Sequence, residues 1–106
     1  MANEIVLSRS FFGHESITVS TTAIGFTAAT ITPSTAAAPV PPAAFALATV
    51  ETDQIRWTAD GTTPTSTVGH LANAGDVIEL HGYENVRNFR AIRVTTDATL
   101  KASFAR

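Results

Sequence analysis

Residues 55–65 carry the feature that most constrains the fold, a short alternating run followed by an Asp-Gly pair and a proline. Ile55 and Trp57 share one parity with polar residues between them, as the two faces of a β-strand require. Asp60 and Gly61 predict a tight turn, because Gly accepts a positive φ and Asp can bond to its own downstream backbone. The pattern is typical of small β-sandwich proteins. The turn motif consists of Asp60, Gly61 and Pro64.

Short runs of this kind recur along the chain, with turn signals about 8–12 residues apart, the interval typical of sandwiches and barrels. In the last run, Leu100, Ala102 and Phe104 are expected to face inward. No segment has a convincing helical pattern. We therefore predict an all-β fold, a single antiparallel β-sandwich of about eight short strands, jelly-roll or immunoglobulin-like. The other runs with strand character are residues 5–7, 16–19, 23–26, 45–51, 77–80 and 89–95.

A chain of 106 residues is expected to form one domain, residues 1–106, with three zones. Residues 1–26 are N-terminal strands or an arm, and residues 45–106 are the main sandwich, in which residues 52–53 predict a tight hairpin. Residues 27–44 are rich in Ala and Pro, and proline excludes both a helix and a central strand. We predict an extended connector there, which either crosses between sheets or lies along a partner. Its prolines are Pro33, Pro39, Pro41 and Pro42.

Two adjacent aromatic residues and a group of arginines are the candidate interface residues. Residues 10–14 are predicted to form a turn that contains Phe11 and Phe12. Because neighbouring strand residues point to opposite faces, both rings cannot enter one core, and we expect one to be exposed or to meet another chain. Five of the seven basic residues lie in the last twenty positions, either as a basic edge or, as we favour, on a solvated face. The candidate arginines are Arg87, Arg90 and Arg93.

The composition favours assembly over chemistry. The charged fraction is 15%, against about 25% for an ordinary soluble domain. Charges are depleted from the cores of interfaces, so a surface rich in Thr and Ala suits a subunit that presses against neighbours, although many β-domains simply have Thr-rich faces. The net charge of −2 provides no basic field for nucleic acid. We expect no membrane association, since no apolar run is long enough and no secretion signal begins the chain.

No catalytic constellation accompanies this pattern. The chain has no cysteine, so disulfides and thiolate metal sites are excluded. The spacing of the histidines fits no zinc motif, and both Asp53 and Asp60 stand at turns, where Asp is common anyway. Trp57 could serve as a stacking platform, but its parity with Ile55 favours the core. We expect neither an enzyme nor a bound cofactor. The histidines are His14, His70 and His81.

Residues 45–106 resemble small virion proteins of tailed bacteriophages. The shared course is a strand with an aliphatic-Arg-aromatic step, an Asp-Gly-Thr-x-Pro-Thr turn, a Gly-Asp before an apolar strand, an aromatic-x-x-Ile-Arg strand, and an ending of aromatic and basic residues. Its elements here are Ile55-Arg56-Trp57, Asp60-Gly61-Thr62-Thr63-Pro64-Thr65, Gly69, Gly75-Asp76, Phe89-Arg90-Ala91-Ile92-Arg93 and Phe104-Ala105-Arg106.

The resemblance implies a protein of the virion, made in the host cytoplasm, that decorates or cements the head. Its implied partners are the major capsid protein and other copies of itself, often in a trimer. The alternatives are a tail or neck component and a carbohydrate-binding module that exposes Trp57. The Asp-Gly-Thr-x-Pro-Thr element also resembles immunoglobulin-like modules of chitin- and hexosamine-degrading enzymes. That likeness spans only a dozen residues and supports the sandwich more than a carbohydrate function.

Overall fold

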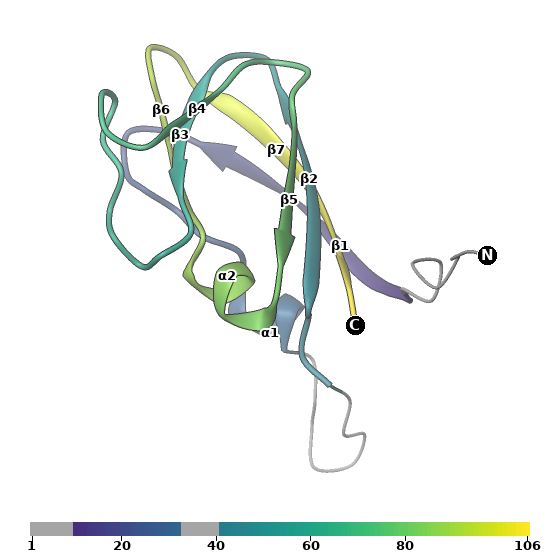
Figure 1. The fold of residues 1–106 in the computed structure, drawn as a ribbon. Helices are drawn as coiled ribbons and strands as arrows, with labels where there is room; N and C mark the ends of the chain where they lie inside the picture. The colour runs from purple at the N-terminus through teal and green to yellow at the C-terminus, as the bar shows by residue number, and fades with distance from the viewer. Residues whose placement is uncertain (1–9, 33–40) are drawn as a thin grey trace, which may run out of the picture.

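A computed structural model describes residues 10–32 and 41–106, in which two antiparallel β-sheets pack face to face (Figure 1). This arrangement confirms the predicted all-β sandwich. The elements in chain order are β1 (Phe11–Val19), α1 (Ala28–Ile31), β2 (Phe45–Glu51), β3 (Ile55–Thr58), β4 (His70–Ala72), β5 (Val77–His81), α2 (Tyr83–Asn88), β6 (Arg90–Arg93) and β7 (Ala98–Ala105).

The two sheets differ in size. The four-stranded sheet has the order β1-β7-β2-β5, and the three-stranded sheet has the order β4-β3-β6. Every pair of neighbouring strands is antiparallel. Strands β1 and β5 are therefore the edges of the larger sheet, and β4 and β6 are the edges of the smaller one.

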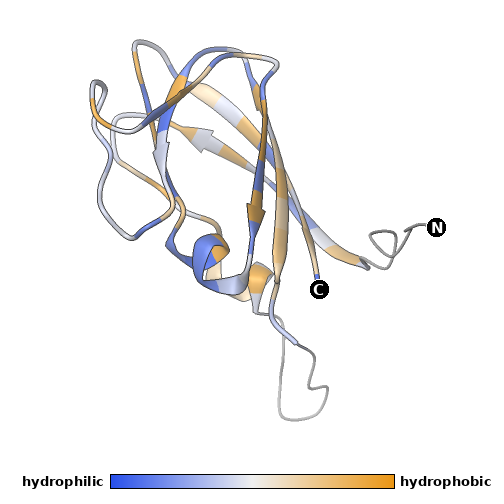
Figure 2. Cartoon of the chain, in the orientation of Figure 1, coloured by the Kyte–Doolittle hydropathy of each residue, from blue (hydrophilic) through white to orange (hydrophobic). Residues whose placement is uncertain are grey.

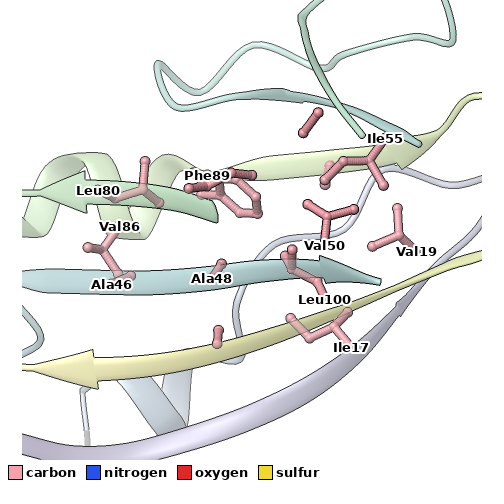
Figure 3. Packing of buried hydrophobic residues seen from close by; sticks show 14 of the residues in the cluster. Ile17, Val19, Ala46, Ala48, Val50, Ile55, Leu80, Val86, Phe89 and Leu100 are labelled. Carbon is pink, nitrogen blue, oxygen red and sulfur yellow. The ribbon is translucent and has the colours of Figure 1, made fainter. Parts of the chain in front are cut away.

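The core lies between the sheets and follows the alternation of the strands (Figure 3). On β7, Leu100, Ala102 and Phe104 are buried while Lys101 is exposed, which confirms the predicted faces. Apolar and polar residues alternate along the strands in Figure 2 as this arrangement requires. Ile55 on β3 and Val50 on β2 meet from opposite sheets and are fully buried.

The predicted hairpin at residues 52–53 is wrong. Strand β2 pairs with β5 and β7, whereas β3 pairs with β4 and β6, so this link passes from one sheet to the other. Thr52 has a φ of 81°, which turns the chain sharply at that point. Both edges of β2 are occupied by ladders longer than β3 could form, and the apolar faces of β2 and β3 then meet across the core.

The first strand also differs from its prediction. Residues 10–14 are not a turn, because β1 begins at Phe11 and runs to Val19. Its register with β7 shifts between Phe11 and Gly13, as in a β-bulge, where an extra residue enters without ending the strand. The run at residues 23–26 forms only an isolated bridge between Ile24 and Ala91. The run at residues 5–7 lies outside the described residues.

Two short helices correct the prediction that none is present. Helix α1 lies within the segment in which proline was expected to exclude a helix, but its four residues precede Pro33. Ile31 is buried, and the Thr32 hydroxyl donates to the carbonyl of Ala28 at 2.6 Å. Helix α2 begins shortly after the strand predicted at residues 77–80, and it is anchored by the buried Val86. Burial of one residue in each helix thus stabilises helical segments that are too short to show a helical period in the sequence.

The connector at residues 27–44 is described only at its ends. The amide of Ala43 donates to the carbonyl of Ile31 at 2.8 Å, so the two ends lie side by side (Figure 1). Both flanking strands, β1 and β2, belong to the four-stranded sheet. The predicted extended course of residues 33–40 lies outside the described residues.

Candidate functional site

The two adjacent phenylalanines separate as predicted. Phe11 is 53% exposed, and its ring meets that of Phe45 edge-on with centroids 6.1 Å apart. Phe12 packs against the core instead, and the guanidinium carbon of Arg106 lies 4.5 Å from the centre of its ring. Phe11 is therefore the ring of this pair that can meet another chain.

Phe11 belongs to the outer face of the four-stranded sheet, the face turned away from the three-stranded sheet. The register places Phe11, Ala105, Phe45 and His81 in one row across all four strands. The rings of Phe45 and His81 lie 5.0 Å apart, so aromatic groups continue along this row. The outer face thus ends in a row of three rings and one alanine, at the end of the sheet where β1 begins.

Beside this row lies a shallow depression of about 460 Å³ across β1, β7 and β2. Hydroxyl and aliphatic side chains make up much of its lining. Lys101 and Glu15 are the charged residues in that lining. The Glu15 carboxylate accepts a hydrogen bond from the amide of Thr27 at 3.0 Å. The depression is lined by His14, Glu15, Ser16, Leu47, Thr49, Lys101, Ala102 and Ser103.

The three candidate arginines interact with their own neighbours. Arg87 on α2 pairs with Glu84 at 3.2 Å, and Arg93 pairs with Asp97 at 2.6 Å. Arg90 donates to the carbonyl of Phe89 at 3.1 Å. Because Arg90 and Arg93 stand three residues apart on β6, they point to opposite faces of the sheet. This arrangement favours the solvated-face interpretation over a single basic edge.

The Asp60 motif forms a turn, as predicted. The Asp60 carboxylate accepts hydrogen bonds from the hydroxyl and the amide of Thr62 at 2.6 and 3.1 Å, and these lower the pKa of Asp60. Gly61 has a φ of 88°, a conformation that favours glycine. Pro64 is fully buried, and a Cβ placed on Gly69 would lie 3.3 Å from its Cβ. The motif therefore fixes the chain rather than presenting a reactive group.

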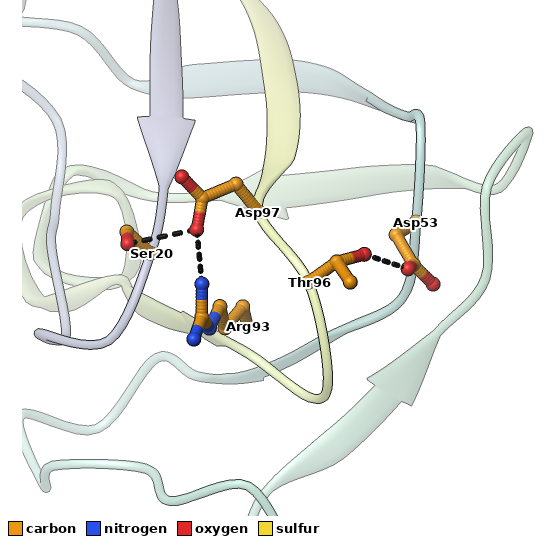
Figure 4. A network of polar contacts seen from close by, with 5 residues as sticks. All are labelled: Ser20, Asp53, Arg93, Thr96 and Asp97. Carbon is orange, nitrogen blue, oxygen red and sulfur yellow. Dashed lines mark hydrogen bonds and ion pairs between the residues drawn. The ribbon is translucent and has the colours of Figure 1, made fainter.

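A second polar network joins the ends of several strands (Figure 4). Asp97 accepts from the Ser20 hydroxyl at 2.8 Å and from the Arg93 guanidinium at 2.6 Å, and these bonds lower the pKa of Asp97. Asp53 accepts from the Thr96 hydroxyl and from the backbone amide of the next residue, which lower its pKa as well. Both carboxylates therefore hold turns in place.

The histidines are dispersed. His14 lies at the depression on the outer face, His70 lies 4.8 Å from the ring of Trp57, and His81 lies 3.4 Å from Glu79. Within residues 10–32 and 41–106, no three His, Cys, Asp or Glu side chains gather closely enough to hold a metal ion. Over the same ranges, no helix has the length and apolar character needed to cross a membrane.

Comparison with known proteins adds no relative: the chain matches no protein family, no curated protein and no solved structure. Function must therefore be argued from the surfaces of this molecule.

Proposed function

We propose that this chain is a non-catalytic structural protein of a tailed-bacteriophage virion, where it decorates the head and bridges capsid subunits. The observation that carries the proposal is the outer face of the four-stranded sheet. It combines an exposed aromatic residue at one end with a wide area of hydroxyl and aliphatic side chains. Low charge at the centre of a contact is what distinguishes interface cores from the remaining surface.

The proposed mechanism is burial of this outer face against the capsid lattice. A stable contact removes about 800 Å² of each partner from water, and aromatic rings that become buried in it supply much of the affinity. Binding to the assembled shell then stabilises it by mass action. In a trimer, three identical faces engage neighbouring subunits, so that weak single contacts add through high effective concentration.

The decisive measurement is the copy number of the chain in purified particles. Quantitative mass spectrometry should find hundreds of copies per particle, and cryo-electron microscopy should place them in a lattice on the head. A handful of copies at the tail or neck would support that alternative location instead. Absence from purified particles would reject a virion role altogether.

A matched pair of variants tests which surface binds. Phe11→Ser removes an exposed ring from the outer face, and Val68→Ser removes an exposed apolar side chain, 59% accessible, from the loop before β4. We expect Phe11→Ser to reduce occupancy on the head while Val68→Ser leaves it unchanged. Solution mass at several concentrations should show a trimer for both. Equal occupancy of the two variants would move the contact away from the outer face.

A further inference from the structure

The sandwich is closed along one side and open along the other. On the closed side, Ile24 and Ala91 exchange two backbone hydrogen bonds of 2.9 and 2.8 Å, and the amide of Arg93 donates to the carbonyl of Ser20 at 3.1 Å. These bonds join the segment after β1 to the edge strand β6. On the other side, between β5 and the three-stranded sheet, lies a cavity of about 570 Å³ that is wide open to solvent. This volume is within the range of small-molecule sites.

One wall of the cavity is aromatic. Trp57 on β3 pairs in register with His70 on β4, and the next pair, Ile55 with Ala72, is buried in the core. Trp57 and His70 therefore lie on the inner face of the three-stranded sheet, with ring centroids 4.8 Å apart. The indole is half-buried and packs against the core, with its ring centroid 5.9 Å from that of Phe89. Its N–H donates to no acceptor among the described residues, so the wall offers both the exposed part of an aromatic ring and a donor.

The opposite wall is an edge strand with polar backbone groups. The amide of Val50 donates to the carbonyl of Asp76 at 2.9 Å, and the amide of Gly82 donates to the carbonyl of Ala44 at 2.7 Å. The backbone groups of residues 76 and 82 therefore point toward β2. Bonding and non-bonding pairs alternate in an antiparallel ladder, which turns the amide and carbonyl of Glu79 toward the open edge. Leu80 adds an aliphatic surface to this wall, and Asp60 adds a carboxylate at the rim.

We propose that this cavity binds a neutral saccharide. A pyranose has an apolar C–H face that can stack on the indole, whose π-face is negative, and hydroxyls that both donate and accept. The indole N–H and the Glu79 amide supply donors, while the Glu79 carbonyl and the Asp60 carboxylate supply acceptors. Asp60 is ionised at neutral pH, as an ordinary carboxyl is, so its negative charge at the rim disfavours anionic sugars and phosphates.

An added peptide strand fits the open edge less well. The side chain of Asn85 already donates to the carbonyl of His81 at 2.8 Å, so one acceptor of the edge is occupied by the chain itself. Strand β5 is five residues long and passes directly into the turn before α2. Continuous main-chain pairing is the basis of strand addition. A compact ligand with scattered hydroxyls matches the remaining groups better.

Trp57 is the only tryptophan of the chain, so its fluorescence reports on this cavity alone. We would titrate the protein with cellotriose, maltotriose and triacetylchitotriose, and with trigalacturonic acid as an anionic probe, and record amide shifts by nuclear magnetic resonance. At least one neutral trisaccharide should give saturable changes at millimolar concentration or below, with shifts concentrated at β3, β4, β5 and α2. The anionic probe should bind more weakly.

Two exposed imidazoles provide a matched pair of variants that preserve the core. His70→Ala should weaken saccharide binding about two- to tenfold, as expected for the loss of one aromatic partner, while His14→Ala on the outer face should leave it unchanged. No saturable response to any neutral trisaccharide would overturn the proposal, as would equal affinity in the two variants. Both experiments use the isolated protein, so their failure would leave the virion proposal standing.

Discussion

The two sheets of this molecule are stabilised in different ways. The strands β1, β7 and β2 of the four-stranded sheet are nine, eight and seven residues long, and their own alternating residues fill the core. The strands of the three-stranded sheet have three or four residues. Its buried inward residues are the large Ile55 and two alanines. The first sheet thus depends on its strand pattern, and the second depends on residues outside its strands.

Phe89 is the main residue outside the strands that supports the three-stranded sheet. It follows α2 immediately before β6, is fully buried, and stacks on Phe26 with centroids 4.6 Å apart and planes within 8°. Phe26 in turn meets Phe104 of the four-stranded sheet edge-on at 4.9 Å. A stack of rings from loop positions therefore connects the two sheets. Because the smaller sheet depends on these loop residues, we expect it to lose its structure first when their contacts are removed.

The largest expected effect comes from Phe89→Ala. Removal of a buried phenylalanine costs about 3–5 kcal/mol of unfolding free energy, because the cavity adds to the lost transfer energy. Chemical denaturation measures the total, and native-state hydrogen exchange should show lower protection in β3, β4 and β6 than in β2 and β7. Phe104→Ala is the matched control and should lower protection in both sheets. An equal loss of hydrogen-exchange protection in both sheets of Phe89→Ala would show that the smaller sheet does not depend on this ring more than the larger one does.

A smaller effect is expected from Gly25→Ala. A Cβ at this position would lie 2.5 Å from the carbonyl oxygen of Phe89, which is backbone and cannot rotate away. The segment that covers β6 must shift, at a cost of about 1–3 kcal/mol, typical of overpacking. At Gly13 the nearest atom to such a Cβ is the Thr30 methyl at 3.9 Å, so Gly13→Ala is the control. Gly25→Ala should have a lower midpoint of thermal unfolding than Gly13→Ala. Similar midpoints would contradict the close approach of Gly25 to the Phe89 carbonyl.

The four-stranded sheet was also the more predictable one. The inward residues of β7 follow directly from the sequence, because an eight-residue strand repeats its alternation often enough to fix its faces. On β6, within the predicted run at residues 89–95, the fully buried position is Ala91 while the larger Ile92 is only half-buried. A four-residue strand carries too little pattern to show which face meets the core. Its surroundings decide this.

The pairing partners of the strands and the short helices were also hard to predict, because short segments carry too little sequence pattern. A turn signal at residues 52–53 indicates that the chain reverses, but it does not indicate whether the next strand joins the same sheet. Helices α1 and α2 have four and six residues, less than two turns, so no periodicity could reveal them. Of the candidate site, alternation predicts only that Phe11 and Phe12 separate, whereas the register shift between Phe11 and Gly13 decides that Phe11 is the exposed ring. The cavity beside Trp57 requires two sheets and could not be predicted.

The Asp60 turn provides a test on the three-stranded side of the molecule with a smaller expected effect. Asp60→Ala removes both hydrogen bonds from Thr62, whereas Asp60→Asn keeps a side-chain oxygen that can accept them. We expect Asp60→Ala to lower the thermal midpoint, by less than Gly25→Ala does, because this turn is exposed to water. Asp60→Asn should unfold close to the wild-type midpoint. If both variants unfold equally far below the wild-type midpoint, the carboxylate acts through its charge and not as a turn acceptor.

The smallest expected effect is the acid dependence contributed by Asp97, which joins the segment after β1 to β6. Its pKa lies below the ordinary value of 3.8, chiefly because the Ser20 hydroxyl and then the Arg93 guanidinium bond to the charged form. As the pH falls, the unfolded chain takes up its proton first. The stabilisation is therefore complete above pH 3.8 and is lost as the pH falls through the lower folded value.

Ser20→Ala isolates this contribution, because it removes the larger cause and leaves the carboxylate in place. Carboxyl titration by carbon nuclear magnetic resonance should show a higher folded pKa for Asp97, and the loss of stability below pH 3.8 should become shallower. The ion pair with Arg93 remains and preserves part of the shift. An unchanged titration of Asp97 would mean that the Ser20 hydroxyl does not bond to this carboxylate in solution, and that Arg93 alone lowers its pKa.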